Sequence, residues 1–258
     1  MRDFYDAFYA VVDHSHTHHA FCEAVFGLDL CQHGFADMAQ LALLLDVTGL
    51  NATHHALDLG CGNGMITEWL ADQSGAQITG LDFIPAAIRQ AQQRTATKSA
   101  RLRFVVGDIN HLTLRPLAFD VIISIDSLYF SDDDNATIHA LNAALCPGGR
   151  MAILYSYGRE PWVPREEFPV DTLAPDKTPL ATALQANGLT FQTWDLTAQD
   201  YALAQRRKEV LATCKAQFEA EGTTFIYDNR MGDARGICQA IEEGLHVRYL
   251  YHVTKGDT

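Results

Sequence analysis

A short glycine-rich segment carries the residues best suited to bind a cofactor. Asp58, Gly60, Gly62 and Gly64 follow one another at D-x-G-x-G-x-G spacing, after an apolar run and before a predicted helix. Glycines let the backbone turn tightly and approach a ligand closely. The helix behind them presents unpaired N–H groups and the positive end of its dipole. The segment, Cys61 included, therefore predicts a site for a nucleotide-like or carboxylate-bearing ligand. Asp58 either touches this ligand or stabilises the loop by accepting backbone N–H groups.

Two further acids follow predicted strands in the same half of the chain. Asp82 ends the next strand, 18 residues after Gly64, and Asp108 ends the strand after that. A carboxylate at the first position can accept both hydroxyls of a ribose, and one at the second can reach an adenine amino group. The alternative is that both are ordinary turn acids. The G-x-G-x-G spacing differs from the G-x-G-x-x-G of dinucleotide enzymes, which disfavours NAD and FAD.

Alternating strands and helices must position these residues. Apolar runs predict strands near 56–59, 77–82, 102–106, 119–125, 150–155, 189–196 and 245–253. Helical patterns lie between them, near 65–72, 85–95, 135–145 and 180–187. The run from Phe119 to Ile125 is almost continuously apolar, as in parallel strands that are buried on both faces. This alternation predicts βαβ units and a doubly wound sheet.

Helical segments flank the predicted sheet. In the first of them, Phe4, Tyr5, Phe8, Tyr9 and Val12 recur at helical spacing and form an aromatic face. We therefore expect a helical cap over residues 1–50 and a second domain over 51–258. Residues 198–221 and 233–243 also have helical patterns, which places a helical insertion at about 197–244, before the last strand.

Five segments together resemble one family of enzymes. They are LDLGCGNG (57–64), GLD (80–82), GDI (107–109), FDVI (119–122) and LCPGGR (145–150). In these residues the chain resembles the class I S-adenosylmethionine-dependent methyltransferases, closely over 56–155 and more loosely to the final strand. The resemblance implies a Rossmann-like α/β fold, with a doubly wound seven-stranded sheet whose last strand is antiparallel. The flanking helices resemble the cap and lid of small-molecule methyltransferases.

The same resemblance implies a set of binding residues. It assigns the glycine loop to the methionine and ribose part of the methyl donor, Asp82 to the ribose, and Asp108 with Ile109 to the adenine. The full set expected to bind the cofactor is Asp58, Gly60, Cys61, Gly62, Gly64, Asp82, Phe83, Asp108, Ile109, Asp126 and Ser127.

The residues after the fourth strand face the methyl donor in this family. Asp126 and Tyr129 are therefore candidate catalytic residues, although a turn acid and a packing tyrosine are the alternatives. An amine acceptor must lose a proton before it attacks, so His33 or His111 could act as a general base, unless each is simply packed or exposed. Other residues could meet the acceptor from later loops: Tyr157, Arg159 and Arg230.

Aromatic residues near the N-terminus have two interpretations. Tyr5, Phe8 and Tyr9 could close over the donor, or shape an aromatic box that attracts a cationic amine. Alternatively, they only pack the cap helices.

Charge and cysteine content exclude several other classes. The 258 residues contain 32 Asp and Glu against 19 Lys and Arg, a net charge of −13, which disfavours nucleic-acid partners. The N-P-P-[YF] tetrapeptide associated with methylation of bases or glutamine is absent. The six cysteines form no C-x-x-C pair, so we expect reduced thiols. Four histidines lie close together near the N-terminus: His14, His16, His18 and His19. No further zinc ligands are evident beside them, so we expect no metal site.

The chain has neither a secretory leader pattern nor an apolar run near the roughly 20 residues of a membrane helix. We therefore expect a cytoplasmic protein without membrane contact, with a homodimer as a further expectation.

The hypothesis is methyl transfer from S-adenosylmethionine to an N or O atom of a small molecule, with S-adenosylhomocysteine as product. Two alternatives stay open. One is a nonenzymatic S-adenosylmethionine-binding protein that regulates or scaffolds a partner. The other is a nucleotide-dependent oxidoreductase, against which the glycine spacing argues.

Overall fold

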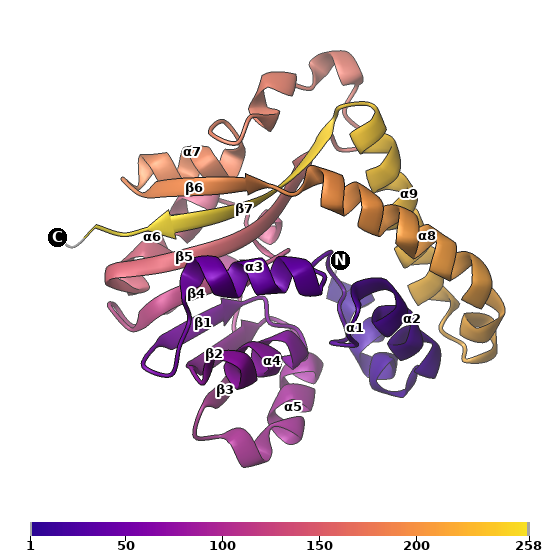
Figure 1. Cartoon of the computed structure of the whole chain (residues 1–258), viewed down its shortest axis with the longest axis horizontal. Helices are drawn as coiled ribbons and strands as arrows, with labels where there is room; N and C mark the ends of the chain where they lie inside the picture. The colour runs from indigo at the N-terminus through magenta and orange to yellow at the C-terminus, as the bar shows by residue number, and fades with distance from the viewer. Residues whose placement is uncertain (1, 257–258) are drawn as a thin grey trace.

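One sheet of seven strands organises the part of the chain that the structure describes, residues 2–256. In this computed structural model the strands lie in the order β3-β2-β1-β4-β5-β7-β6 (Figure 1). They are β1 (His55–Leu59), β2 (Gln77–Asp82), β3 (Leu102–Val106), β4 (Phe119–Ile125), β5 (Leu145–Gly158), β6 (Thr190–Asp195) and β7 (His246–Thr254). Pairing is parallel from β3 through β5, whereas β7 runs antiparallel to β5 and β6. The predicted α/β sheet with an antiparallel last strand is therefore confirmed.

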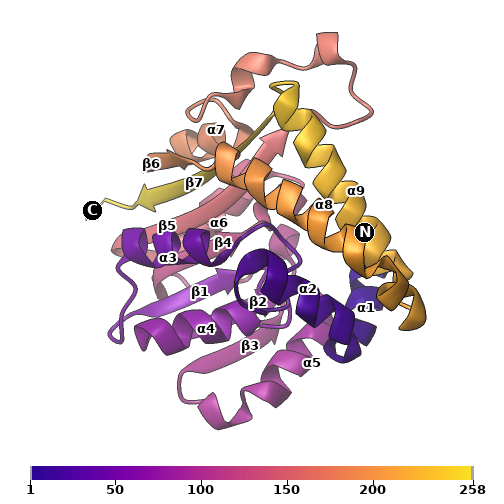
Figure 2. The same cartoon turned by 45° about the vertical axis from the view of Figure 1, so that its right-hand side comes forward.

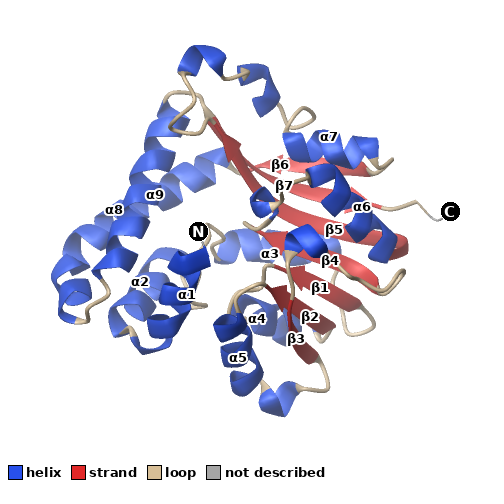
Figure 3. Cartoon of the chain, turned by 180° about the vertical axis from the view of Figure 1, so that it is seen from behind, coloured by secondary structure: helices blue, strands red, loops and turns tan. Residues whose placement is uncertain are grey.

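Helices cover both faces of this sheet (Figure 3). One face packs against α3 (Met38–Thr48), α4 (Met65–Ser74) and α5 (Pro85–Arg94), and the other against α6 (Asp134–Ala144) and α7 (Pro179–Ala186). Strand β4 shows why its sequence is continuously apolar. Ile122 belongs to the core on one face, while Val121 and Ile123 belong to the core on the other, because successive side chains of a strand alternate.

Four helices lie beside the sheet and form a third core of their own. They are α1 (Arg2–Val11), α2 (His16–Phe26), α8 (Thr197–Ala220) and α9 (Thr224–Glu242). Figure 2 shows α1 and α2 next to α8 and α9, at the end of the sheet where β1 and β4 finish. Their core contains Phe8, Phe21, Phe218 and Ile226, so segments from the two ends of the chain are packed together.

Helix α9 is longer than its sequence pattern predicts. It begins at Thr224 rather than at residue 233. Gly232 has low helix propensity and is typical of a break, which explains the later predicted start. The remaining short elements are 3₁₀ helices: η1 (Val12–His14), η2 (Ala96–Lys98), η3 (Ile109–His111), η4 (Leu128–Phe130), η5 (Arg165–Glu167) and η6 (Val170–Leu173). Within residues 2–256, no helix combines the length and apolar character that crossing a membrane requires.

Candidate active site

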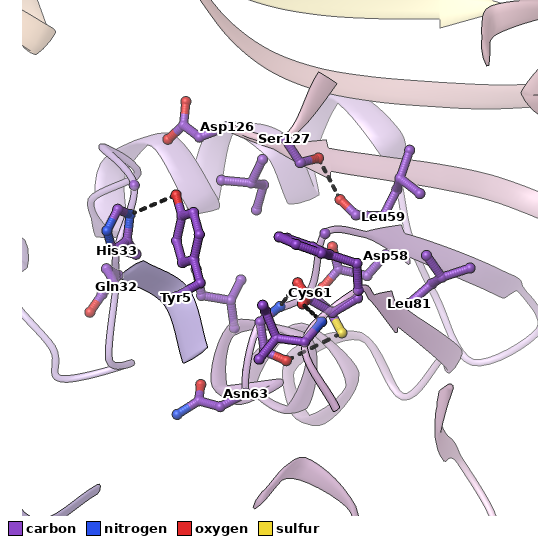
Figure 4. Close-up of a pocket in the computed structure, with 18 of the residues that line it drawn as sticks. Tyr5, Gln32, His33, Asp58, Leu59, Cys61, Asn63, Leu81, Asp126 and Ser127 are labelled. Atoms are coloured by element: carbon purple, nitrogen blue, oxygen red, sulfur yellow. Dashed lines mark hydrogen bonds between the residues drawn. The ribbon is translucent and has the colours of Figure 1, made fainter. Parts of the chain in front are cut away.

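A cavity opens where β1, β2 and β4 end, with helix α1 and the 30–36 segment on its other side (Figure 4). Ligands of doubly wound sheets bind at this edge, outside the carboxyl ends of the strands. Of the residues expected to bind the cofactor, and of the catalytic candidates Asp126, Tyr129 and His33, all line the cavity except Gly64 and Asp108. The positions that the sequence spreads over about a hundred residues are thus brought to one place.

The glycine loop has a backbone that side chains would disturb. Gly60, Gly62 and Gly64 have φ angles of 79°, 55° and 74°, in the left-handed region. A Cβ atom on Gly60 would also collide with Ser127, and one on Gly62 would collide with the hydroxyl of Tyr9. Gly64 sits at the start of α4, behind the cavity wall. The loop therefore requires glycine both for its conformation and for its close contacts.

Asp82 holds the loop from the neighbouring strand. Its Oδ2 accepts the Gly62 N–H and its Oδ1 accepts the Ile84 N–H, both at 2.9 Å. Burial raises the pKa of this carboxyl group, and the backbone hydrogen bonds oppose that rise. Each carboxylate oxygen keeps a second lone pair. The side chain is thus fixed at the cavity and can still accept hydrogen bonds from a ligand.

Asp58 is hydrogen-bonded to a side chain of α4 rather than to the backbone of the glycine loop. It is buried, and its Oδ2 accepts a 2.6 Å hydrogen bond from the Thr67 hydroxyl on α4. Burial raises the pKa of Asp58 to about 6, although the bond from Thr67 lowers it. This contact ties α4 to β1, so Asp58 stabilises the loop through the helix that follows it.

Ser127 joins the two strands that flank the cavity. Its hydroxyl donates to the carbonyl of Leu59 at 2.6 Å (Figure 4). The same hydroxyl lies 2.7 Å from the hydroxyl of Ser124. The loop after β4 is thereby attached to the loop after β1.

Asp126 is paired on both carboxylate oxygens. Its backbone adopts a φ of 51°. Its Oδ1 accepts a hydrogen bond from Nη1 of Arg248, and its Oδ2 accepts one from Nη2 of Arg248 at 3.1 Å. Oδ2 also accepts the Phe35 N–H at 2.7 Å, which holds the 30–36 segment across the cavity. Asp126 therefore lies at the cavity wall as part of a buried ion pair.

Arg248 is the residue that sequence reasoning missed here. It is fully buried on β7, donates to Gln40 at 3.0 Å and to Ser156 at 2.7 Å, and lies 3.9 Å from a carboxylate oxygen of Asp200. A charged residue within the buried, otherwise apolar last strand is the feature that could have indicated it, because buried charges are paired.

His33 faces the cavity from the 30–36 segment. Its Nδ1 lies 3.4 Å from the Tyr5 hydroxyl (Figure 4), and its Nε2 is buried without a hydrogen-bond partner among the described residues. Burial, and then the nearby charge of Arg230, lowers the pKa of His33 well below its usual value. The imidazole is therefore neutral at pH 7.

The other sequence candidates divide between the cavity, the core and the surface. Phe83, Ile109 and Tyr129 line the cavity. Asp108 lies outside it, with an exposed carboxylate that accepts the Asn110 N–H at 2.9 Å and lies 3.3 Å from exposed His111.

The aromatic residues of α1 are likewise divided between the cavity and the core. Tyr5 and Tyr9 line the cavity, while Phe8 is fully buried with the guanidinium of Arg230 5.2 Å from its ring centre. Arg230 also donates to the carbonyl of His33 at 3.0 Å. Tyr157 lies in the fold away from this cavity, 3.1 Å from the hydroxyl of Thr172.

The N-terminal histidines have protein partners. His18 is buried, 3.2 Å from Nη2 of Arg230, and His19 lies 2.6 Å from Asp29. Among residues 2–256, no group of three or more His, Cys, Asp or Glu side chains is arranged to hold a metal ion.

Known proteins resemble the chain in both sequence and fold. Residues 56–149 match the family described as a methyltransferase domain. Methyltransferase GfsG of Streptomyces halstedii is 32% identical over 126 residues, which cover 48% of this chain and 44% of GfsG. The chain thus spans less than half the length of this curated relative. Residues 56–149 thus carry a methyltransferase domain.

The matched methyltransferase domain contains the glycine loop, Asp82 and Asp126, but neither His33 nor Arg248. Solved structures extend the likeness of fold beyond it. Phosphoethanolamine N-methyltransferase 2 of Haemonchus contortus, in complex with phosphomonomethylethanolamine and S-adenosylhomocysteine, has a TM-score of 0.75 at 18% identity. That alignment covers 95% of this chain and 59% of the other. The [4+2]-cyclase SpnF has a TM-score of 0.74 at 18% identity, over 100% and 96% of the two chains.

Proposed function

We propose that the chain transfers a methyl group from S-adenosylmethionine to an N or O atom of a small molecule and releases S-adenosylhomocysteine. Asp82 carries this proposal. Two backbone N–H groups hold its carboxylate at the cavity, beside the glycine loop of a methyltransferase domain. The remaining lone pairs suit the two hydroxyls of a ribose, which the donor and its product share.

The roles of the other residues follow from their places around the cavity. Gly60, Cys61 and Gly62 bind the methionine and ribose part, while Ile109 and Phe83 flank the base and Asp108 reaches its amino group from the rim. Asp58 and Gly64 keep the loop in shape from behind. Asp126 and Ser127 form the wall that faces the donor methyl group.

The reaction is an in-line displacement on a sulfonium ion, so the protein mainly orients the two reactants and excludes water. The lone pair of the acceptor atom forms the bond to the methyl carbon, and the C–S pair returns to sulfur. The neutral imidazole of His33 takes the proton that the acceptor loses, and Tyr129 lines the same cavity. Both act as catalytic residues in this proposal.

The helices beside the sheet complete the proposal. Residues 1–50 act as a cap and 197–244 as a lid, and the acceptor lies between them. The net charge of −13 supports a small molecule rather than nucleic acid as partner. All six cysteines are free thiols, which supports a cytoplasmic location. A homodimer stays a prediction that analytical ultracentrifugation tests.

Calorimetric titration tests donor binding directly. We expect S-adenosylmethionine and S-adenosylhomocysteine to bind one site in the folded protein, and NADH not to compete. Incubation with the labelled donor and fractionated metabolites then identifies the methylated product. Folded protein that binds neither compound contradicts the proposal. Donor binding without methylation of any fraction would favour the nonenzymatic alternative.

A further inference from the structure

A second cavity adjoins the first on the side of the flanking helices. The two cavities share five lining residues and therefore adjoin each other. These residues are Tyr5, His33, Gly34, Tyr129 and Phe130. The second cavity is otherwise lined by α9 and by residues 159–161 after β5.

Two glycines of α9 keep one wall of this cavity open. Gly232 and Gly236 both line it, one helical turn apart. A Cβ atom added at either would meet no other atom within 4 Å, and both have ordinary helical backbone angles. Neither packing nor conformation therefore requires glycine here, although glycine weakens the interior of a helix. Instead, the two glycines leave open space in the second cavity.

Aromatic rings from separate segments form the opposite wall. Tyr5 of α1 meets Phe130 of η4 with ring centres 6.0 Å apart and planes at 87°, and Tyr129 meets Phe130 at 4.5 Å and 63°. Phe4 is a further ring on the same cavity. Steeply inclined rings present both faces and edges to the space that they enclose. The faces of such rings attract cations.

The charged groups of the cavity are mainly acidic. It is lined by the carboxylates of Glu160, Asp233 and Glu243 and by one guanidinium, that of Arg159, which lies 3.8 Å from Glu243. Asp233 makes no hydrogen bond or ion pair with another described side chain closer than 4 Å, although it is mostly buried. Its carboxylate is therefore available to a ligand.

Two arginines lie close to Asp233, but they do not change the mainly acidic character of the second cavity. Arg207 and Arg230 are fully buried and line neither cavity. Arg207 is stacked over the ring of Phe35 at 3.9 Å, and Arg230 donates to the carbonyl of His33. A ligand in the second cavity therefore meets three carboxylates and several aromatic faces, and a single guanidinium, that of Arg159, which lies beside Glu243.

We infer that the second cavity is the acceptor site and that it binds a protonated amine, held by Asp233 and the aromatic wall. This inference rests on the proposed function and narrows its acceptor to a nitrogen atom. The ammonium group loses one proton as the reaction proceeds, with the neutral imidazole of His33, which lines both cavities, as the general base. The nitrogen lone pair then forms the N–C bond, while the C–S bond breaks and its electron pair stays on sulfur.

Binding measurements on protein loaded with S-adenosylhomocysteine test the charge preference. Choline serves as the cationic probe, and 3,3-dimethyl-1-butanol has the same shape without the charge. We expect choline to bind at least about tenfold more tightly than the alcohol. Asp233→Asn is expected to weaken choline binding about tenfold, whereas Asp228→Asn, at an exposed position of the same helix, should leave it unchanged.

Filling the cavity provides a second test. Gly236→Ala and Gly236→Leu remove the open space stepwise while favouring the helix, so choline binding should fall in that order with S-adenosylhomocysteine binding intact. Equal binding of the alcohol and choline, or full binding by both Asp233→Asn and Gly236→Leu, overturns the inference. Failure to bind S-adenosylhomocysteine instead contradicts the proposed function itself, so the two failures are distinguishable.

Discussion

The glycine loop and the flanking helices differ in how far along the sequence their buried charged residues find hydrogen-bond partners. At the loop, Asp58 and Asp82 are bonded to Thr67, Gly62 and Ile84, all at most 20 residues away in sequence. In the flanking helices, Arg230 is bonded to the carbonyl of His33, 197 residues away. Local contacts shape the glycine loop, whereas contacts between the two ends of the chain hold the flanking helices.

Arg207 sharpens the contrast. It is fully buried, and none of its three guanidinium nitrogens has a hydrogen-bond partner among the described residues. Arg248, at the border of the two regions, is equally buried but paired with Asp126, Gln40 and Ser156. Burial alone therefore does not tell how much an arginine contributes to stability. Its partners decide that.

The largest effect is expected for Arg248→Met. This substitution leaves the carboxylates of Asp126 and Asp200 buried without their shared cation. The free energy of unfolding in urea should fall by about 3–5 kcal/mol. Arg103→Met, at an exposed position of β3, is the control and should change it by less than about 0.5 kcal/mol. A loss below about 1 kcal/mol at Arg248 would show that the network contributes little.

Asp82→Ala should have the next largest effect, on donor affinity. Loss of two charge-assisted hydrogen bonds to a ribose predicts about 100-fold weaker binding of S-adenosylhomocysteine by calorimetry. Asp108→Ala removes an exposed carboxylate at the rim and should cost about tenfold. Circular dichroism must show both variants folded. Equal effects at the two positions would contradict the assignment of the ribose to Asp82.

The buried histidine His18 predicts a moderate dependence of stability on pH. Burial, then the charge of Arg230, lowers its pKa well below the usual value near 6.5 in the folded protein. Below about pH 6.5 the unfolded chain therefore binds more protons than the folded one, and stability falls as pH falls.

Urea unfolding between about pH 7.5 and 6 measures this slope. Asp58 works in the opposite direction because its pKa is raised to about 6, so the test compares slopes between variants. His18→Gln keeps an acceptor for Arg230 but does not titrate, and it should make stability depend less steeply on pH. An unchanged slope would show that His18 contributes nothing to it.

The smallest effect is expected for Arg207→Met. The substitution removes a buried guanidinium without hydrogen bonds and keeps similar volume, but it also removes the stack on Phe35. The net change in the free energy of unfolding should lie between zero and a gain of about 1 kcal/mol. Arg206→Met, at the exposed neighbouring position, provides the baseline. A loss of about 3 kcal/mol or more would place Arg207 in the same class as Arg248.

The same contrast explains how far the sequence could be interpreted. The strands and the glycine loop were predictable because periodicity and short spacings determine them. Helix α9 was misjudged at its start because Gly232 obscures the pattern. Arg248 was missed because its partners Asp126 and Gln40 lie 122 and 208 residues away. No local rule connects residues at such separations.

Arg248 also bears on how substitutions combine. It touches side chains from β4, β5 and α3 and lies beside Asp200 of α8, so four segments share one positive charge. Effects of substitutions at independent sites add, whereas those at sites with a common partner do not. Changes at Asp126 and Asp200 are therefore coupled through Arg248. A change in α8 that alters Asp200 will shift the outcome of any later change at Asp126, so the order in which such changes accumulate matters.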